Sequence, residues 1–351
     1  VVCRMVSLSL EHGNCDGSCF CYVWLGMFAG PRFDNYEDGF RFAQLGYDLV
    51  EKRGLTRYQA RTYMNIGCTV MPWAKHVGSG RELIRRAFDA AYRVGDLTFA
   101  SYSWDQLVTN FLAVGDPLAE TQAECENGLS FARRVQFGLV IELCSLQLGL
   151  VMSLRGLTDK FGSLDHLEYT EAETERRLAS NPNLVFAEFY YLTRKCEARF
   201  FAGDAATAAQ ASLKADALVW TSSAQFETAE HQLYGALAHA GAWDGATAEW
   251  KPKHLAALTA HHRQLAIWAR HSPETFDNRA AIAAAEIARI EGRILVAQDL
   301  YEKARQKYVA LLAYKVPTGS DSDQKHGEDE ERRVADTFRV ISLSFSNLGG
   351  P

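Results

Sequence analysis

The sequence lacks any apolar run long enough to cross a lipid bilayer. The most apolar segment, from Cys19 to Gly30, has 12 residues, and the run from Gly138 to Met152 is interrupted by Glu142 and Gln147. A membrane-spanning helix needs about 20 consecutive apolar residues. The sequence therefore predicts no membrane span.

It also lacks a recognisable targeting segment. No secretory signal precedes Glu11 and His12, and the chain begins at Val1 rather than at a methionine. A signal peptide has a basic segment, an apolar segment and a small-residue cleavage site. We expect an excised or incomplete segment of a protein that works in the cytoplasm.

An excess of positive charge is absent as well. Lys and Arg total 37 against 43 Asp and Glu, which gives a net charge of -6, and no basic cluster stands out. Nucleic acids and anionic membrane surfaces need a basic patch, so neither is an expected partner. Hydrophobic residues make up 48% and aromatic residues 11% of the chain, which is enough for a folded core.

The eight cysteines do not form a disulfide pattern. Most lie in apolar helical runs, and they are scattered over a chain too large to need covalent crosslinks. We expect free thiols. Only Cys15, Cys19 and Cys21, together with His12, resemble a metal cluster, but their spacing does not match the paired ligands of structural zinc sites.

Alternating strand patterns are missing, and prolines are few. Five of them fall at expected helix boundaries: Pro31, Pro117, Pro182, Pro273 and Pro317. Pro72 is the exception, because it lies inside a helical pattern from about Thr56 to His76, which it should kink near Cys68. Helical periodicity dominates elsewhere, so the sequence predicts an all-α fold.

What the chain does contain is a repeated pattern of small residues. Gly292, Ala297, Tyr301 and Ala304 reproduce the spacing of Gly203, Ala208, Ser212 and Ala215, which occur 89 residues earlier. A glycine that ends one helix, followed by small or aromatic residues along the next, allows two antiparallel helices to pack closely. Ala208 and Ala297 should therefore face their partner helices.

The glycine spacing extends this pattern along the chain. Turns inside helix pairs are expected at Gly30, Gly78, Gly115, Gly156, Gly203, Gly241 and Gly292, and breaks between pairs near Gly54, Gly95, Phe137, Asn181, Ser222 and Ser272. We predict about seven pairs over residues 1–316 that resemble tetratricopeptide (TPR) repeats and form a superhelical solenoid. An acidic disordered linker at 317–333 and a short atypical tail at 334–351 should follow.

No motif for catalysis or cofactor binding is found. His254, His261 and His262 share one predicted helix, and His231 and His239 another, but two turns separate them, so a metal would need a third helix and an exposed face is favoured. The glycine-rich segment 78–81 lacks the strand and the lysine of a phosphate-binding loop. We expect no catalytic residue, no metal and no cofactor.

Repeat geometry suggests where a partner would bind. The outward positions of the first helices should present charged and aromatic side chains to the concave face of the array. These residues are Tyr102, Asp105, Gln106, Tyr190, Arg194, Glu197, Arg279, Glu286 and Arg289. A generic solvated helix face is the alternative interpretation of each.

Several longer segments of the sequence resemble those of a known protein family. Segments such as LSLEHGNCDGSCFCYVWLGMFAGPRF, YEDGFRFAQLGYDLVEKRGL and ARTYMNIGCTVMPWAKHVGSGRELIRRAFDAAYRVGDLTFASYS, followed by ARFFAGD, FETAEHQLYGALA, LAALTAHHRQL and AAEIARIEGR, occur in that order. They resemble the TPR-like region of very large bacterial signalling proteins. Those proteins join a serine/threonine-kinase-like domain, an AAA-type ATPase, this helical array, a GAF sensor and a histidine kinase. The resemblance covers about the first 305 residues, and the chain departs from the pattern beyond Arg305.

The resemblance implies a regulatory or scaffolding role. The kinase, ATPase and phosphoacceptor motifs of that family lie outside this segment, so no catalytic residue is carried over. Its expected partner is a protein or a neighbouring domain, namely the ATPase or kinase module of the parent. A free-standing TPR-like adaptor and a helical-repeat enzyme acting on a small molecule remain alternatives, and the sequence does not indicate the oligomeric state.

Overall fold

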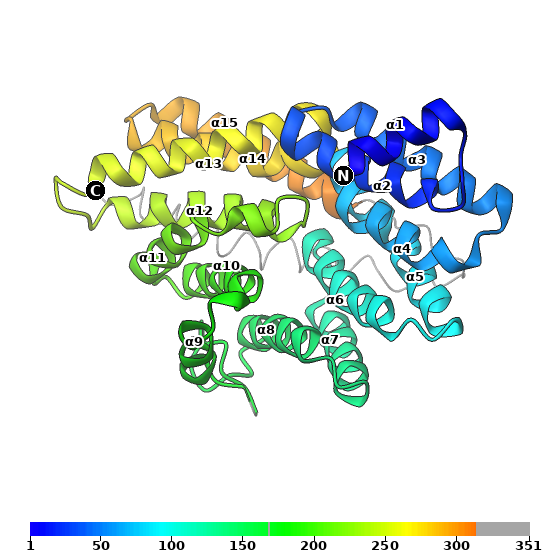
Figure 1. Ribbon diagram of the computed structural model, residues 1–351. Helices are drawn as coiled ribbons and strands as arrows, with labels where there is room; N and C mark the ends of the chain where they lie inside the picture. The colour runs from blue at the N-terminus through cyan, green and yellow to red at the C-terminus, as the bar shows by residue number, and fades with distance from the viewer. Residues whose placement is uncertain (168, 314–351) are drawn as a thin grey trace.

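The computed structural model describes residues 1–167 and 169–313, and these residues form an all-helical protein (Figure 1). No strand occurs among them, and the only extended pairing is a single bridge between His166 and Tyr169. The predicted all-α class is confirmed. The predicted linker at 317–333 and tail at 334–351 lie outside the described residues, as do the last three residues of the predicted array.

The bounds of the α-helices in this part of the chain are as follows: α1 Val2–His12, α2 Ser18–Phe33, α3 Tyr36–Arg53, α4 Thr56–Asn65, α5 Arg81–Arg93, α6 Leu97–Val114, α7 Leu118–Arg134, α8 Gly138–Leu154, α9 Glu171–Ser180, α10 Val185–Phe201, α11 Ala205–Asp216, α12 Glu227–Trp243, α13 Lys251–His271, α14 Pro273–Ile290 and α15 Ile294–Leu312. Short turns of other helical types, η1 Ile66–Val70, η2 Met71–Trp73, η3 Val77–Gly80, η4 Pro182–Leu184 and η5 Val219–Thr221, lie between them.

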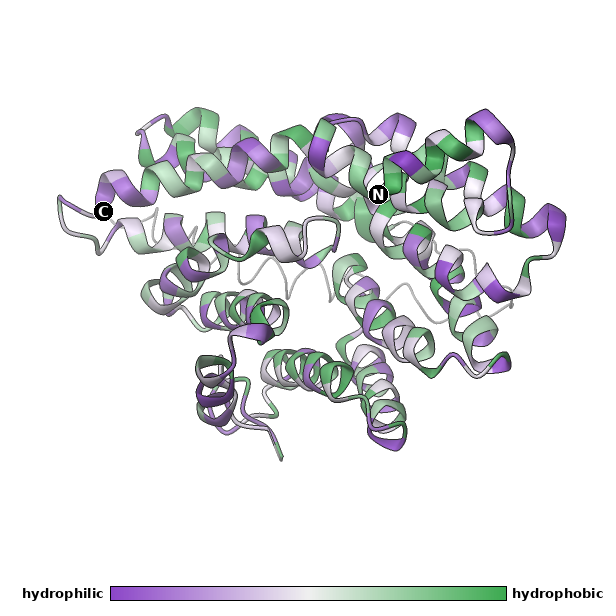
Figure 2. Ribbon diagram, viewed as in Figure 1, coloured by the Kyte–Doolittle hydropathy of each residue, from purple (hydrophilic) through white to green (hydrophobic). Residues whose placement is uncertain are grey.

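Most successive helices pack on one another. The contacts join α2 to α3, α4 to α5, α6 to α7, α10 to α11, α12 to α13 and α14 to α15, and contacts of similar extent join α5 to α6, α7 to α8, α11 to α12 and α13 to α14. Helix α8 departs from this scheme because it packs on α7 and α10, whereas α9 contacts mainly α10. Their residue compositions differ in the same sense: α8 is largely hydrophobic and α9 largely hydrophilic (Figure 2).

The two turns that revealed the repeat have the predicted form. Gly203 and Gly292 follow α10 and α14 with φ of 77° and 75°, in the left-handed region that glycine adopts without strain. Asp204 then caps α11, because its side chain accepts a hydrogen bond from the amide of Thr207 at 3.1 Å. Ala208 is 0% and Ala297 2% exposed, so both are buried as predicted.

Three glycines expected at turns lie elsewhere. Gly30 is inside α2 and Gly241 inside α12, and Gly78 belongs to the short η3 turn. Gly30 is needed for a close approach instead, because a Cβ atom there would lie 2.2 Å from the ring of Tyr36. Glycine therefore marks helix contact as well as helix ends, and spacing alone does not separate the two uses.

The segment around Pro72 is distorted, as its sequence predicts. Helix α4 ends at Asn65, a π-helical turn follows over Ile66–Val70, and Met71–Trp73 tightens into a 3-10 turn. Proline has no amide hydrogen and cannot continue the α-helical hydrogen bonds. The distortion turns Trp73 into the interior, where it is 3% exposed.

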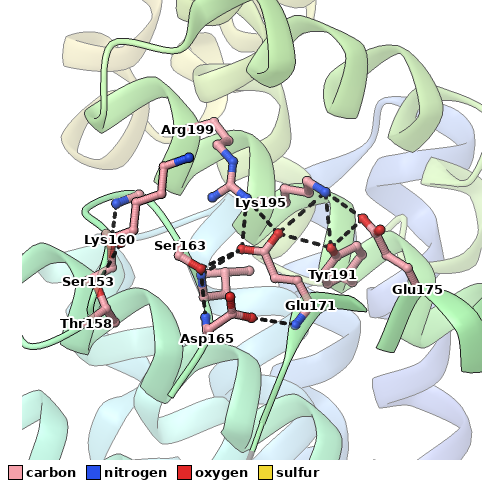
Figure 3. A network of polar contacts seen from close by, with 12 residues as sticks. Ser153, Thr158, Lys160, Ser163, Asp165, Glu171, Glu175, Tyr191, Lys195 and Arg199 are labelled. Atoms are coloured by element: carbon pink, nitrogen blue, oxygen red, sulfur yellow. Dashed lines mark hydrogen bonds and ion pairs between the residues drawn. The ribbon is translucent and has the colours of Figure 1, made fainter. Parts of the chain in front are cut away.

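A long loop joins α8 to α9 and is held by Glu171 (Figure 3). The Glu171 carboxylate accepts hydrogen bonds from the Leu164 amide at 2.8 Å and from Arg199 at 2.7 Å, and Lys195 lies 3.5 Å away. The Glu171 amide in turn donates to Asp165 at 2.7 Å. One buried carboxylate thus ties the loop to α10.

The first and last parts of the described chain are in contact. In Figure 1, α2 and α3 lie beside the end of α13 and the start of α14. The Trp268 indole donates to the hydroxyl of Tyr36 at 2.8 Å, and the Trp73 ring stacks on Phe276 with centroids 5.4 Å apart. The hydroxyl of Ser272 donates to the Lys75 carbonyl at 2.9 Å. We call this group of contacts the closure contact.

The closure contact corrects one sequence-based expectation. A regular repeat array has contacts only between neighbouring repeats. Here Tyr36 and Trp268 bond across 232 residues of sequence. None of the described helices is both long and apolar enough to span a bilayer.

Candidate functional site: a buried polar axis

The inner faces of α6, α8, α10, α12 and α14 bring polar side chains together in the middle of the protein. We call this set the polar axis: Asp105, Gln106, Gln147, Arg194, Glu197, Glu227, Glu230 and Arg279, each at most 6% exposed. On a helix, residues three apart share a face, which places Arg194 with Glu197 and Glu227 with Glu230. Four carboxylates therefore surround two guanidinium groups.

Asp105 forms one end of the polar axis. Its carboxylate accepts hydrogen bonds from the amide nitrogens of Gln106 at 3.0 Å and Gln147 at 2.6 Å. One turn further along α6, the hydroxyl of Thr109 donates to Glu227 at 2.5 Å. These bonds join α6 to α8 and to α12.

Arg194 occupies the centre. It is 1% exposed and donates to Glu197 at 3.0 Å and to Glu227 at 3.5 Å. Burial alone would lower the pKa of Arg194, but the two carboxylates raise it. The arginine stays charged and holds the carboxylates of α10 and α12 together.

Arg279 forms the other end. It donates to Glu230 at 3.2 Å and to the Thr275 carbonyl at 2.7 Å, and its guanidinium lies 5.3 Å from the centre of the Phe226 ring. Cation–π contacts of this kind favour arginine in water-poor sites. Arg279 thereby links α14 to α12.

Two acidic groups of the polar axis, Asp105 and Glu197, have raised pKa values. Burial, followed by the neighbouring Glu227, raises the pKa of Asp105 to about 7. Burial also raises the pKa of Glu197 to about 7, although Arg194 opposes the shift. Strongly perturbed acids in a cluster are a feature of functional sites, although structural ion-pair networks share it.

Several buried polar atoms of this region have no hydrogen-bond partner among the described residues. They are Gln106 Oε1, Gln147 Oε1, Thr193 Oγ1, Arg194 Nε and Arg279 Nε. An unpartnered buried polar group costs about 1–3 kcal/mol, so proteins usually supply a partner such as an ordered water or a ligand. The polar axis therefore retains capacity to bind a polar group.

A pocket of about 110 Å³ adjoins the Arg279 end. Glu230, Asn278, Arg279 and Arg305 supply charged and amide groups, and apolar residues of α6, α10, α12, α14 and α15, such as Leu233 and Ile282, complete the lining. An apolar pocket with a few converging polar groups is the usual form of a small-ligand site.

The residues predicted for the concave face are not an exposed surface. Asp105, Gln106, Tyr190, Arg194, Glu197, Arg279 and Glu286 are buried, and Tyr102 and Arg289 are half-buried. The expectation of solvated charges is wrong because the opposing helices approach closely enough to pair these charges with one another. Their role in binding a partner stays a prediction.

The structure brings some of these residues together and separates others. Asp105, which is bonded to Gln106, interacts electrostatically with Arg194, and Arg194 pairs with Glu197. Glu286 forms a second group, in which it accepts hydrogen bonds from Arg289 at 2.8 Å and from the hydroxyl of Tyr301 at 2.5 Å. Tyr102 lies apart and packs its ring against Phe99 and Phe137.

Sequence reasoning missed three members of the polar axis, namely Gln147, Glu227 and Glu230. A signal for two of them was present, because Glu227 and Glu230 repeat the three-residue spacing of Arg194 and Glu197 on the first helix of the next pair. Gln147 is one of the few polar residues in the apolar α8, and a polar residue on a buried helix usually has a polar partner.

The histidines are also placed differently from the expectation. His231, His239 and His261 are 0%, 1% and 3% exposed, so they do not form an exposed face. All eight cysteines are free, as expected. Cys19 and Cys21 are buried, whereas the His12 side chain is 73% exposed.

Comparisons with known proteins give no family assignment. No family model matches this chain, and no curated protein matches it.

Proposed function

We propose that this chain is a non-catalytic regulatory or scaffolding module of a larger signalling protein. Its parent would combine the kinase, AAA-type ATPase and sensor domains that accompany the TPR-like regions it resembles, and would work in the cytoplasm. In this proposal the helix pairs form a superhelical solenoid, and the partner is a neighbouring domain of the same protein.

The closure contact is the observation that carries the proposal. It joins α3 and η2 to α13 and α14, so movement at this contact changes the relative position of the first and last helix pairs. A module that links two domains can transmit a signal by such movement. A partner or ligand that prefers one state shifts the equilibrium toward it.

The polar axis supplies a second element of the mechanism. Its charges are paired internally through Arg194 and Arg279, so a partner can engage them only by replacing those pairs. Breaking a buried ion pair without replacing it costs about 3–5 kcal/mol. The arrangement in which these charges are paired internally is therefore favoured until a binding partner provides compensating contacts.

The experiment uses the protein encoded by the complete gene. ATPase and kinase activities would be compared for the wild type, Trp268→Ala, which weakens the closure contact, and Trp220→Ala, a control at a side chain that is 67% exposed. Tyr36→Phe is a milder variant that removes only the hydrogen bond to Trp268. Circular dichroism would confirm that each variant is folded.

A regulatory module predicts that Trp268→Ala changes basal activity several-fold in a protein that remains folded, whereas Trp220→Ala does not. Equal activities in all variants would contradict the proposal. A complete gene without kinase or ATPase coding on either side would replace it with the free-standing adaptor.

A further inference from the structure

Three consecutive helices, α11, α12 and α13, bring metal-binding side chains together. Asp216, His231 and His261 each offer one ligand atom, and these atoms all lie within 4.8 Å of one another. The closest pair is Asp216 Oδ1 and His231 Nε2, at 2.8 Å. The expectation of no metal rested on the two-turn spacing of the histidines along single helices, and the fold supplies the missing third helix.

The proton of His261 is positioned by its neighbour. His261 Nδ1 donates to Gln232 Oε1 at 2.8 Å, which leaves the lone pair on Nε2. Metal-binding histidines commonly use one ring nitrogen in this way to orient the other. In the absence of a metal, Nε2 accepts a hydrogen bond from Ser212 Oγ at 3.3 Å.

Space at that nitrogen is kept open by a glycine. A Cβ atom at Gly235 would lie 2.7 Å from His261 Nε2 and 2.6 Å from Ser212 Oγ. Gly235 is one turn after His231 on α12, as Ser212 is one turn before Asp216 on α11, so both helices present two residues to the same place. Any larger residue at 235 would crowd the ligand atom.

The site combines buried histidine ligands with a carboxylate that reaches the solvent. His231 is fully buried, and its second ring nitrogen has no hydrogen-bond partner in the described part of the chain. The Asp216 side chain is 41% exposed and opens the site to the surface.

We propose that Asp216, His231 and His261 bind one divalent ion of the zinc class, with a fourth position beside Ser212 open to water. Two imidazoles and a carboxylate suit Zn²⁺ and its substitute Co²⁺, whereas Mg²⁺ and Ca²⁺ favour oxygen-only sites. Ligand atoms at about 2.0 Å from a tetrahedral zinc ion lie about 3.3 Å from one another. Small movements of the three side chains would therefore bring their ligand atoms to these distances.

The proposal is independent of the role in signalling. A bound ion would join α11, the second helix of one pair, to α12 and α13 of the next pair. It would therefore stabilise the folded protein, by an amount that grows with the logarithm of the free metal concentration once this exceeds the dissociation constant.

The test uses the full chain after treatment with a chelator. Zn²⁺ binding would be measured by isothermal titration, the Co²⁺ complex by its visible absorption, and thermal stability with and without Zn²⁺. The variants are Asp216→Asn, His261→Gln and Gly235→Ala. His262→Gln is the matched control, because it changes a histidine next to His261 that is not one of the three ligands.

We expect one equivalent of Zn²⁺, a tetrahedral Co²⁺ spectrum and a higher melting temperature with metal. Asp216→Asn and His261→Gln should weaken binding at least about tenfold and abolish the stabilisation. Asp216→Asn alters a partly exposed group, so it remains informative if His261→Gln fails to fold. Absence of saturable binding by the wild type would overturn the proposal, and equal binding by Asp216→Asn would place the metal elsewhere, for example at the exposed Cys15 and His12.

Discussion

Buried charge is the feature that distinguishes this protein at the scale of single residues. Arg194 and Arg279 are 1% and 5% exposed, yet each is hydrogen-bonded to a carboxylate of another helix. Removing a charge from water is expensive, and only close pairing compensates for it. Reversing Arg194 to glutamate would place three acidic groups together, so it would test stability rather than partner binding.

The raised pKa of Asp105 gives a prediction about pH. The folded carboxyl holds its proton up to about pH 7, and an unfolded one only to about pH 4. Its contribution to stability is therefore fully present below about pH 4 and is lost as the pH rises to about 7. Asparagine does not ionise, so Asp105→Asn does not lose this stability. The free energy of unfolding of Asp105→Asn relative to that of the wild type should therefore rise by about 1 kcal/mol or more from pH 5 to pH 8.

Urea denaturation of both proteins at pH 5 and pH 8 measures this difference. Asp116→Asn is the control, because Asp116 lies just beyond the end of α6, pairs with Arg81 and is more exposed than Asp105. A stability difference that did not change with pH would contradict the assignment of the raised pKa to Asp105.

At the scale of the helix pair, small residues set the packing distance. Ala297 lies in a cluster with Ala285, Ala288 and Tyr301, where α15 crosses α14. Because interiors are close-packed, added volume forces side chains from their preferred rotamers. The repeated alanine positions should therefore tolerate little enlargement.

Ala297→Phe should destabilise the protein by about 1–3 kcal/mol through overpacking. Chemical denaturation measures the change, and Leu295→Phe is the control, since Leu295 on the same helix is 77% exposed. Equal midpoints for the two variants would mean that Ala297 does not limit the approach of the helices.

Glu171 gives the matching prediction for the loop between α8 and α9. Glu171→Ala removes the acceptor of Leu164 and Arg199 and leaves the Arg199 charge without its closest partner, at a cost of about 2–4 kcal/mol. Limited proteolysis should then cut within residues 155–170 faster than in the wild type. Glu173→Ala, at an exposed position two residues away, should leave the cleavage rate unchanged.

On the scale of the whole molecule, the closure contact makes the two ends of the described chain interdependent. Trp73, Trp268 and Phe276 form its aromatic centre, with ring centroids 4.8–5.4 Å apart. Truncation of a buried Trp side chain typically costs about 3–5 kcal/mol. Because this cost falls on a contact between distant segments, the shape should change as well as the stability.

Trp268→Ala should lower the melting temperature and enlarge the maximum dimension measured by small-angle X-ray scattering. Trp220→Ala, at an exposed side chain, should change neither. A destabilised Trp268→Ala protein of unchanged dimension would show that the closure contact stabilises the fold without holding the ends together.

The sequence by itself determined the all-α class, the free cysteines, the turns at Gly203 and Gly292 and the distortion at Pro72. These features depend on local physics, namely helical periodicity, the φ range of glycine and the missing amide of proline. Such effects act over a few residues and are readable in one segment at a time.

The tertiary structure alone decided the environment of the polar and histidine residues. Arg194 and Glu286 have the composition of a solvated helix face, and they are buried because distant helices bring complementary groups to them. His231 and His261 come together with Asp216 only where α11, α12 and α13 meet. Burial and pairing are properties of several segments at once, and the periodicity of one helix carries no information about which helix will oppose it.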